Sequence, residues 1–294
     1  MKNIFTYSAA AVLGFGLLAA PEADAQQFSK RKKYNTVGFS LNAMNYFGDL
    51  VSQTDFTSFR FKATRPNVGI NVTRRFYPRI SGRLALSYGR ITGDDALAAS
   101  QTDPDAKYRY NRNMNFKNDI LEASGVVIFD LIENRNNYLK RPDFVPYVFA
   151  GVAGFYHNPK GVKADGTVVD LQPLATEGVK YSLAQFSLPF GGGVRYRINR
   201  NFDASFEIGW RKTFTDYLDD VSGTYVDPAK LTTPDALYFG RGITRSIQNP
   251  ALGFEGFTSP GSSRRGKDGN DWYIVTGLSL NYILTPKIKN PKFR

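Results

Sequence analysis

The sequence predicts an all-β protein, an eight-stranded antiparallel transmembrane (outer-membrane) β-barrel with long extracellular loops. Three observations predict this fold. Eight long segments alternate apolar and polar residues, the connections between them alternate short and long, and no stretch after residue 25 approaches the about 18 consecutive apolar residues of a helical span. A tilted strand needs about 9–11 residues to cross a bilayer, whereas strands of soluble proteins average about 5–6.

The last segment, residues 271–284, shows the alternation most clearly. Trp272, Ile274, Leu278 and Tyr282 fall on one face, which is apolar and has aromatic side chains near both ends. The opposite face carries small or polar residues such as Ser279. A strand with lipid on one side and a polar lumen on the other has this layout. The segment therefore predicts a membrane-crossing strand.

Seven earlier segments repeat the pattern, at residues 35–45, 67–77, 80–92, 118–131, 144–156, 182–198 and 202–214. Short connections follow the second, fourth and sixth segments, and long connections follow the others. Outer-membrane barrels sort their connections in this way, with short periplasmic turns and long outer loops, whereas a soluble sandwich has no reason to do so. We therefore expect the cell outer membrane as the location, with both termini in the periplasm.

The sixth segment contains two residue types that disturb strands. Gly191, Gly192 and Gly193 predict a bend or a bulge, because a glycine in a strand often marks such a position. Pro189 has no N–H to donate and must occupy a place in the ladder that tolerates this loss.

Four regions are expected along the chain. Residues 1–25 resemble a secretory signal peptide, since Lys2 precedes a mostly apolar stretch and Ala23-Asp24-Ala25 is a typical cleavage site. Residues 26–34 form a basic leader, residues 35–284 the barrel and residues 285–294 a basic tail. The chain has no cysteine, so an exported barrel of this sequence would rely on its closed hydrogen-bond ladder instead of disulfides.

The formal net charge of +12 raises the question of an acidic partner. Nucleic acid is not expected, because the chain is exported and its basic residues are not gathered on one helix. The predicted topology places many of them at the periplasmic rim, where we expect either a solvated surface or a surface that contacts a periplasmic partner. The candidate partner-binding residues are Lys30, Arg31, Lys32, Lys33, Arg135, Lys140, Arg141, Lys287, Lys289 and Lys292.

Charged residues are also predicted inside the barrel. An eight-stranded barrel is just wide enough to be filled by its own side chains, and unpaired buried charges are costly. We therefore expect ion pairs across the lumen; a narrow solute path is the alternative. The inward charged residues are Arg83, Glu122, Arg195, Arg197, Glu207 and Arg211.

An enzyme or a metal protein is not expected. Outer-membrane lipid hydrolases use a Ser–His pair, and the single histidine, His157, has no serine nearby with an obvious geometry. Asp216, Asp219, Asp220 and Asp227 follow the seventh segment, but their spacing matches no Ca²⁺-binding loop and favours solvated carboxylates. No catalytic residue and no cofactor are predicted.

Four segments together resemble one family: Tyr46-Phe-Gly-Asp-Leu, residues 177–190, residues 211–222 and Asn270-Asp-Trp-Tyr. They are similar to the PorG family, small outer-membrane barrels of the type IX secretion system in Bacteroidetes. The resemblance implies a non-enzymatic role, in which the barrel ties the outer membrane to a periplasmic ring built from proteins resembling PorK and PorN. Outer-membrane lipids would be the other partner. A small passive porin-like or surface-binding barrel is the alternative function.

Overall fold

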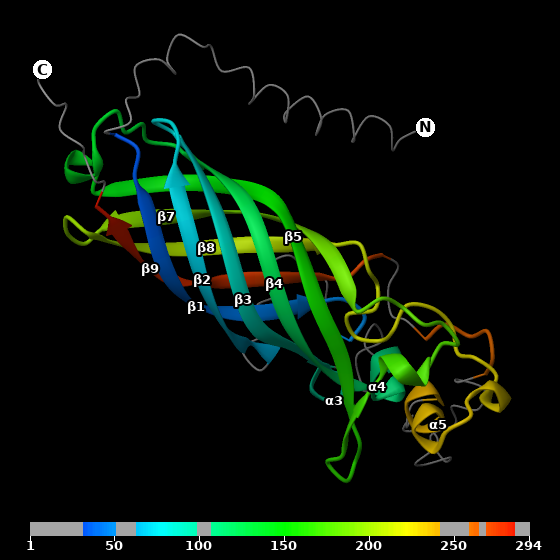
Figure 1. The fold of residues 1–294 in the computed structure, drawn as a ribbon. Helices are drawn as coiled ribbons and strands as arrows, with labels where there is room; N and C mark the ends of the chain where they lie inside the picture. The colour runs from blue at the N-terminus through cyan, green and yellow to red at the C-terminus, as the bar shows by residue number, and fades with distance from the viewer. Residues whose placement is uncertain (1–31, 51–62, 99–106, 242–258, 265–268, 286–294) are drawn as a thin grey trace, which may run out of the picture.

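The protein forms a closed barrel of eight long antiparallel strands (Figure 1). The structure is a computed structural model that describes residues 32–50, 63–98, 107–241, 259–264 and 269–285. The long strands are β1 (Asn35–Phe47), β2 (Arg65–Arg75), β3 (Ile80–Asp94), β4 (Asn115–Asp130), β5 (Phe144–Val162), β7 (Ala184–Arg197), β8 (Phe202–Thr213) and β9 (Trp272–Leu284). Sequential strands pair with one another, and the β1–β9 pairing closes the circle. The predicted fold class is confirmed.

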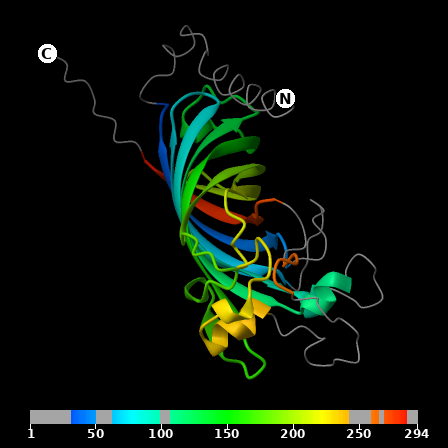
Figure 2. The same ribbon diagram turned by 90° about the vertical axis from the view of Figure 1, so that its right-hand side faces the viewer.

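The connections differ at the two ends of the barrel. One end, called here the short-turn end, carries the start of β1, the end of β9 and the three connections β2–β3, β4–β5 and β7–β8 (Figure 1). The opposite end, called the loop end, carries the helices α3 (Asp95–Ala98), α4 (Lys107–Arg112) and α5 (Pro234–Arg241), which Figures 1 and 2 show beyond the barrel. Short 3₁₀ turns lie at η2 (Tyr138–Lys140), η3 (Gln172–Leu174) and η4 (Pro228–Lys230). In the part of the chain with a described structure, no helix has both the length and the apolar character to cross a bilayer.

The strands extend further into the loop end than the sequence predicts. β5 continues from the expected end near residue 156 to Val162, and the short strand β6 (Val168–Asp170) pairs with this extension. The third long connection is therefore partly a hairpin. Its turn contains Gly166 with a φ of +85°, a left-handed conformation that glycine adopts without strain.

The outer face of the barrel wall is apolar and exposed. Leu278 in the middle of β9 is 62% exposed, and its neighbours on the flanking strands are Leu41 and Phe206, which are also exposed. Leu84, on the outer face of β3, is 71% exposed. A band of large apolar side chains around the whole wall is what a barrel presents to the hydrocarbon of a bilayer.

The wall is covered at the loop ends of β1 and β9. Ile274 was predicted to face lipid like Leu278, but it is buried, as is its cross-strand neighbour Asn45. The hydroxyl group of Thr64, just before β2, donates a hydrogen bond to Asn45 Oδ1 (2.8 Å). The prediction that Ile274 faces lipid is therefore wrong, because the wall is covered at this position and at the adjacent Asn45.

Of the predicted bend or bulge at Gly191–Gly193, the bulge is wrong, because β7 keeps an unbroken register with β8 through these residues. The glycines instead leave space for two inward aromatic rings. A Cβ at Gly191 would lie 2.9 Å from the ring of Phe149, and one at Gly193 would lie 2.9 Å from that of Tyr147. Pro189 lies where the β5–β7 ladder is interrupted, between the pairs Ala150–Phe190 and Ala153–Ser187, which is a position that tolerates a residue without an N–H.

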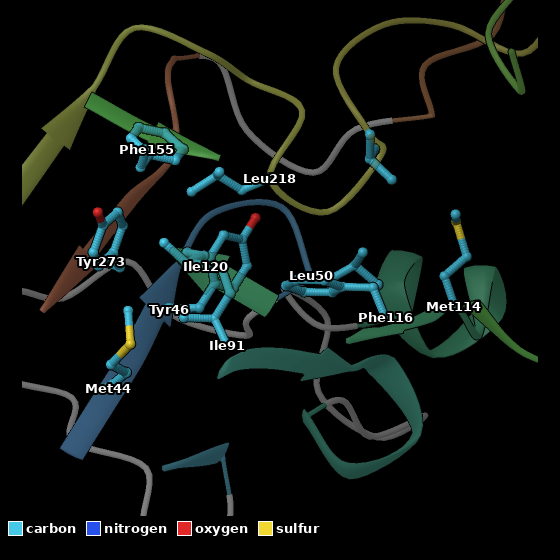
Figure 3. Packing of buried hydrophobic residues seen from close by; sticks show 11 residues of the cluster. Met44, Tyr46, Leu50, Ile91, Met114, Phe116, Ile120, Phe155, Leu218 and Tyr273 are labelled. Carbon is cyan, nitrogen blue, oxygen red and sulfur yellow. The ribbon is translucent and has the colours of Figure 1, made fainter. Parts of the chain in front are cut away.

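The hydrophobic core lies where the connections of the loop end meet the barrel strands. Met44, Tyr46, Ile120 and Tyr273 come from the barrel strands, and Leu218 comes from the connection between β8 and β9 (Figure 3). The other members are Leu50, Ile91, Met114, Phe116, Phe155 and Val221. The loop end is therefore packed onto the barrel mouth, and its connections are ordered by buried apolar contacts.

Candidate functional site

The barrel lumen is crossed by two ion pairs, as predicted. Arg83 on β3 pairs with both carboxylate oxygens of Glu207 on β8, and Tyr147 donates its hydroxyl proton to Glu207 Oε1 (2.5 Å). Arg211 pairs with Glu122 (Nε–Oε2 3.3 Å), which also accepts a hydrogen bond from Tyr273. Each of these charges has an opposite charge beside it, both carboxylates accept a further hydrogen bond from a tyrosine, and the Arg83 guanidinium lies over the ring of Phe149, which offsets the cost of burial.

A third charged group lies nearer the short-turn end and was only half predicted. Asp130 accepts from Arg75 (3.1 Å) and from the predicted Arg195 (3.2 Å). The prediction for Arg197 is wrong, because it pairs with Asp143 at the start of β5, whose carboxylate is largely exposed. Strand alternation could have placed Arg75 and Asp130 inside, since both lie at the ends of predicted strands on the inward face.

The space left between these side chains is small. One cavity of about 60 Å³ lies between Asn67, Arg83, Glu122 and Arg211, and a second of about 30 Å³ lies between Arg75, Arg83 and Glu207. Such volumes hold a few water molecules. Arg83 and Glu207 line both cavities, so their ion pair stands between them.

The candidate partner-binding residues lie at the short-turn end where the structure describes them. Lys30, Arg31, Lys287, Lys289 and Lys292 lie outside the described residues, as do the expected signal peptide and most of the leader and tail. Lys32 and Lys33 directly precede β1 and are half-buried, with Lys33 Nζ 5.7 Å from the ring centroid of Tyr77. Arg135 and Lys140 are exposed in the β4–β5 turn, and Arg135 pairs with Glu133 (2.9 Å).

Arg141 has a different environment from the other candidates. It is buried, pairs with Asp203 (2.6 Å) and donates to the backbone carbonyls of Asn199 (2.7 Å) and Arg200 (3.0 Å). These contacts join the β4–β5 turn to the β7–β8 turn. Arg141 therefore stabilises the short-turn end from within and presents no charge to a partner.

Other exposed cations at this end were not among the candidates. Arg74, Arg79 and Arg200 lie at or next to the short turns and are exposed. The sequence could have indicated them, because Arg79 and Arg200 lie in the predicted short connections and Arg74 lies near the end of the second predicted strand. Together with Arg135 and Lys140 they make the short-turn end strongly basic.

The loop end holds a buried polar network around two arginines. Arg112 on α4 pairs with Asp95 on α3 (Nε–Oδ2 2.8 Å) and donates to the carbonyls of Asp49 (2.6 Å) and Arg264 (3.0 Å). Arg264 in turn pairs with Glu177 (3.1 Å) and lies 3.6 Å from Asp220. Two fully buried guanidinium groups thus join four connections, and no local sequence pattern indicates this because the partners are far apart in the chain.

Two buried carboxyl groups share one hydroxyl group nearby. The hydroxyl of Tyr46 lies 2.7 Å from Asp219 Oδ2 and 2.7 Å from Asp271 Oδ1. Burial raises the pKa of Asp271 well above its usual range, and the neighbouring Asp219 raises it further; burial and Asp49 raise the pKa of Asp219 in the same way. A phenol has one proton to donate, so one of the two carboxyl groups must be protonated to complete both contacts.

The residues considered for catalysis and Ca²⁺ binding have structural contacts. His157 is fully buried, lies 3.2 Å from the amide nitrogen of Asn118 and stacks on Tyr181, and no serine hydroxyl bonds to it among the described residues. Asp219 and Asp220 are buried and hydrogen-bonded, not solvated as predicted. Within the described ranges, no three acidic, histidine or cysteine side chains are placed to hold a metal ion.

Several solved outer-membrane proteins are similar to this chain. Ail from Yersinia pestis is 8% identical, with 86% of this chain and 99% of that chain covered and a TM-score of 0.39. Neisserial surface protein A is 11% identical (84% and 96% covered, TM-score 0.38), and OprG from Pseudomonas aeruginosa is 10% identical (88% and 99% covered, TM-score 0.35). No curated protein sequence matches the chain.

One family of protein domains matches the greater part of the sequence. The match covers residues 25–234, from the expected cleavage site through seven strands of the barrel and into α5. On this match, the chain belongs to the family described as "Domain of unknown function (DUF6089)".

Proposed function

We propose that the protein is an outer-membrane barrel of the type IX secretion system, which anchors or assembles a periplasmic ring at the membrane. The observation that carries the proposal is the concentration of exposed basic residues at the short-turn end. Arg135, Lys140 and Arg200 lie there, beside the start of β1 and the end of β9. The residues resembling the PorG family support the nature of the partner, a ring of proteins resembling PorK and PorN.

The placement in the membrane is supported by the wall and by the two ends. The apolar outer face suits hydrocarbon, and short turns face the periplasm in bacterial outer-membrane barrels. With this orientation, the basic surface lies in the periplasm and the packed loop end lies outside the cell. The docking surface then includes Lys32, Lys33, Arg135 and Lys140, and it omits Arg141, whose donors are engaged within the barrel.

The lumen favours an anchoring role over the passive channel. The Arg83–Glu207 and Arg211–Glu122 pairs lie across it, and the two cavities of about 60 and 30 Å³ beside them hold only a few water molecules. A hydrated ion or a small solute would have to break at least one of these pairs to pass.

Charge reversal with a matched control tests the anchoring role. We expect the Arg135→Glu/Lys140→Glu variant to lose the ring proteins when the barrel is purified from detergent-solubilised envelopes, because an interface based on charge attraction becomes repulsive. The control variant Lys180→Glu/Lys230→Glu changes the charge by the same amount at exposed positions of the loop end and should retain the ring proteins. Equal recovery of the ring proteins with both variants would refute docking at the short-turn end.

A further inference from the structure

The lipid-facing wall ends at the short-turn end in a group of cations that lie against aromatic rings. Arg74, on the outer face of β2, has its guanidinium carbon 5.6 Å from the ring centroid of Phe76. Arg79, in the β2–β3 turn, lies 6.0 Å from that of Phe129 on β4. Lys33 lies 5.7 Å from that of Tyr77. Three cations on neighbouring parts of one wall thus share the same environment.

The register places these cations directly next to the apolar band. Arg74 pairs with Gly82 across β2–β3, and the next outward pair toward the middle of the wall is Val72–Leu84, both exposed and apolar. Residues two positions apart on a strand lie about 7 Å from each other. The guanidinium of Arg74 therefore lies within the width of a headgroup layer from the hydrocarbon.

The wall is shaped so that the ring of Phe76 can lie flat beside Arg74. A Cβ on Gly82 would stand 2.9 Å from Phe76 Cε2, so the ring occupies the space that a side chain would fill. Phe76 and Tyr77 are themselves partly exposed on this side. An aromatic ring that is half in hydrocarbon, with a cation over its face, is typical of the membrane–water interface.

No carboxylate balances the charge of this patch. Within the described ranges, Lys33, Arg74 and Arg79 form no ion pair with Asp or Glu, although thirteen such pairs occur elsewhere. Glu133, in the β4–β5 turn, pairs with Arg135. Arg79 donates to the carbonyl of Leu131 (2.9 Å), which uses one of its five N–H groups. The other N–H donors of these three side chains are therefore suited to an anionic ligand.

We propose that Lys33, Arg74 and Arg79 form a binding site for the phosphate group of a membrane phospholipid in the leaflet at the short-turn end. The guanidinium forks of Arg74 and Arg79 suit phosphate oxygens, and the exposed Val72 and Leu84 contact the acyl chains. The inference rests on the proposed membrane placement of the barrel. It shares only Lys33 with the docking surface, and its test changes Arg74 and Arg79, so it does not depend on the ring partner. On this proposal, the barrel binds a phospholipid headgroup at one defined part of its wall, next to β2 and the β2–β3 turn.

Lipid binding to the purified protein in detergent tests the site. The probe is phosphatidylglycerol, titrated and measured by native mass spectrometry, and the comparison lipid is diacylglycerol, which lacks the phosphoglycerol headgroup. We expect Arg74→Gln/Arg79→Gln to bind phosphatidylglycerol about 25-fold more weakly, from roughly fivefold for each cation near an anionic group. Diacylglycerol should bind weakly to both proteins. Equal binding of phosphatidylglycerol to both, or equal binding of the two lipids to the unaltered protein, would overturn the proposal.

Two further variants and one competitor distinguish a lipid site from a packing defect and from a free-phosphate site. Arg74→Lys/Arg79→Lys keeps the charges and should keep most of the affinity, so a loss as large as that of the Gln variant would show a packing defect and overturn the role of charge. Arg135→Gln/Lys140→Gln removes two cations at the same end but away from the wall, and it should bind the lipid normally. Competition by equimolar inorganic phosphate would show a free-phosphate site and overturn the assignment to lipid. If Arg74→Gln/Arg79→Gln loses lipid and retains the ring proteins, the two proposals stand independently.

Discussion

Replacing Arg264 by Met should open the loop end while leaving the barrel intact. Arg264 is fully buried and pairs with Glu177 and Asp220, and it donates to Thr176 Oγ1 (2.8 Å) and to the carbonyls of Asp220 (2.7 Å) and Phe239 (3.1 Å). Methionine fills most of the volume but leaves two carboxyl groups without their cation. Breaking a buried pair in this way costs about 3–5 kcal/mol.

Hydrogen exchange measures this loss where it occurs. We expect protected amides in the connection from β8 to α5 to exchange at least about 100-fold faster in Arg264→Met, since about 1.4 kcal/mol corresponds to a factor of ten in an opening equilibrium. Arg135→Met is the matched control, because its ion pair is 62% exposed on the arginine side and such surface pairs contribute about 0–1 kcal/mol. Strand amides should be unchanged in both variants. Acceleration by less than about tenfold in Arg264→Met would show that this network does not hold the loop end together.

Two other predictions concern the wall and the shared hydroxyl group. Leu278→Arg should destabilise the barrel in bilayers by about 2–4 kcal/mol in denaturant unfolding, and Leu284→Arg, near the end of the same exposed face, by about 0–1 kcal/mol; equal costs would contradict the membrane placement. The pKa of Asp271 is raised in the folded state, so above about pH 4 the folded protein binds more protons than the unfolded protein. The loop end should therefore lose stability as the pH rises from about 4 through the raised pKa. Asp271→Asn keeps an acceptor for the N–H of Leu218 and a donor for Tyr46, and it should flatten this pH dependence in hydrogen exchange; an unchanged slope would show that Asp271 is not the group that titrates.

The alternation of apolar and polar residues predicted the barrel and some of the ion pairs in its lumen. All eight segments became strands, and the pairs Arg83–Glu207 and Arg211–Glu122 formed across the lumen as expected from their inward positions. A period of two fixes the face of each residue, and burial in a closed barrel favours the pairing of inward charges of opposite sign. Near strand ends a side chain can also reach the turns, so Arg197 pairs with Asp143 there and not in the lumen.

The loop end could not be predicted, because its contacts have no local period. Arg264 meets Glu177 across 87 residues of sequence, and Tyr46 meets Asp271 across 225. The acidic residues after β8 looked solvated because a run of aspartates is usually exposed, yet Asp219 and Asp220 accept hydrogen bonds in a dry interior. Only the packed connections bring those donors to them.

The sequence alone determined most of the wall of this protein: the eight long strands, the outward face of their middle parts and the end that carries the short turns. These properties follow from the two-residue repeat of an extended chain and from the length needed to cross a bilayer. The tertiary structure decided which charges find one another, why Arg141 is held inside while Arg74 and Arg79 remain exposed against aromatic rings, and how the long connections pack. Those outcomes depend on distances between residues far apart in the chain, which are fixed when the strands close into a circle.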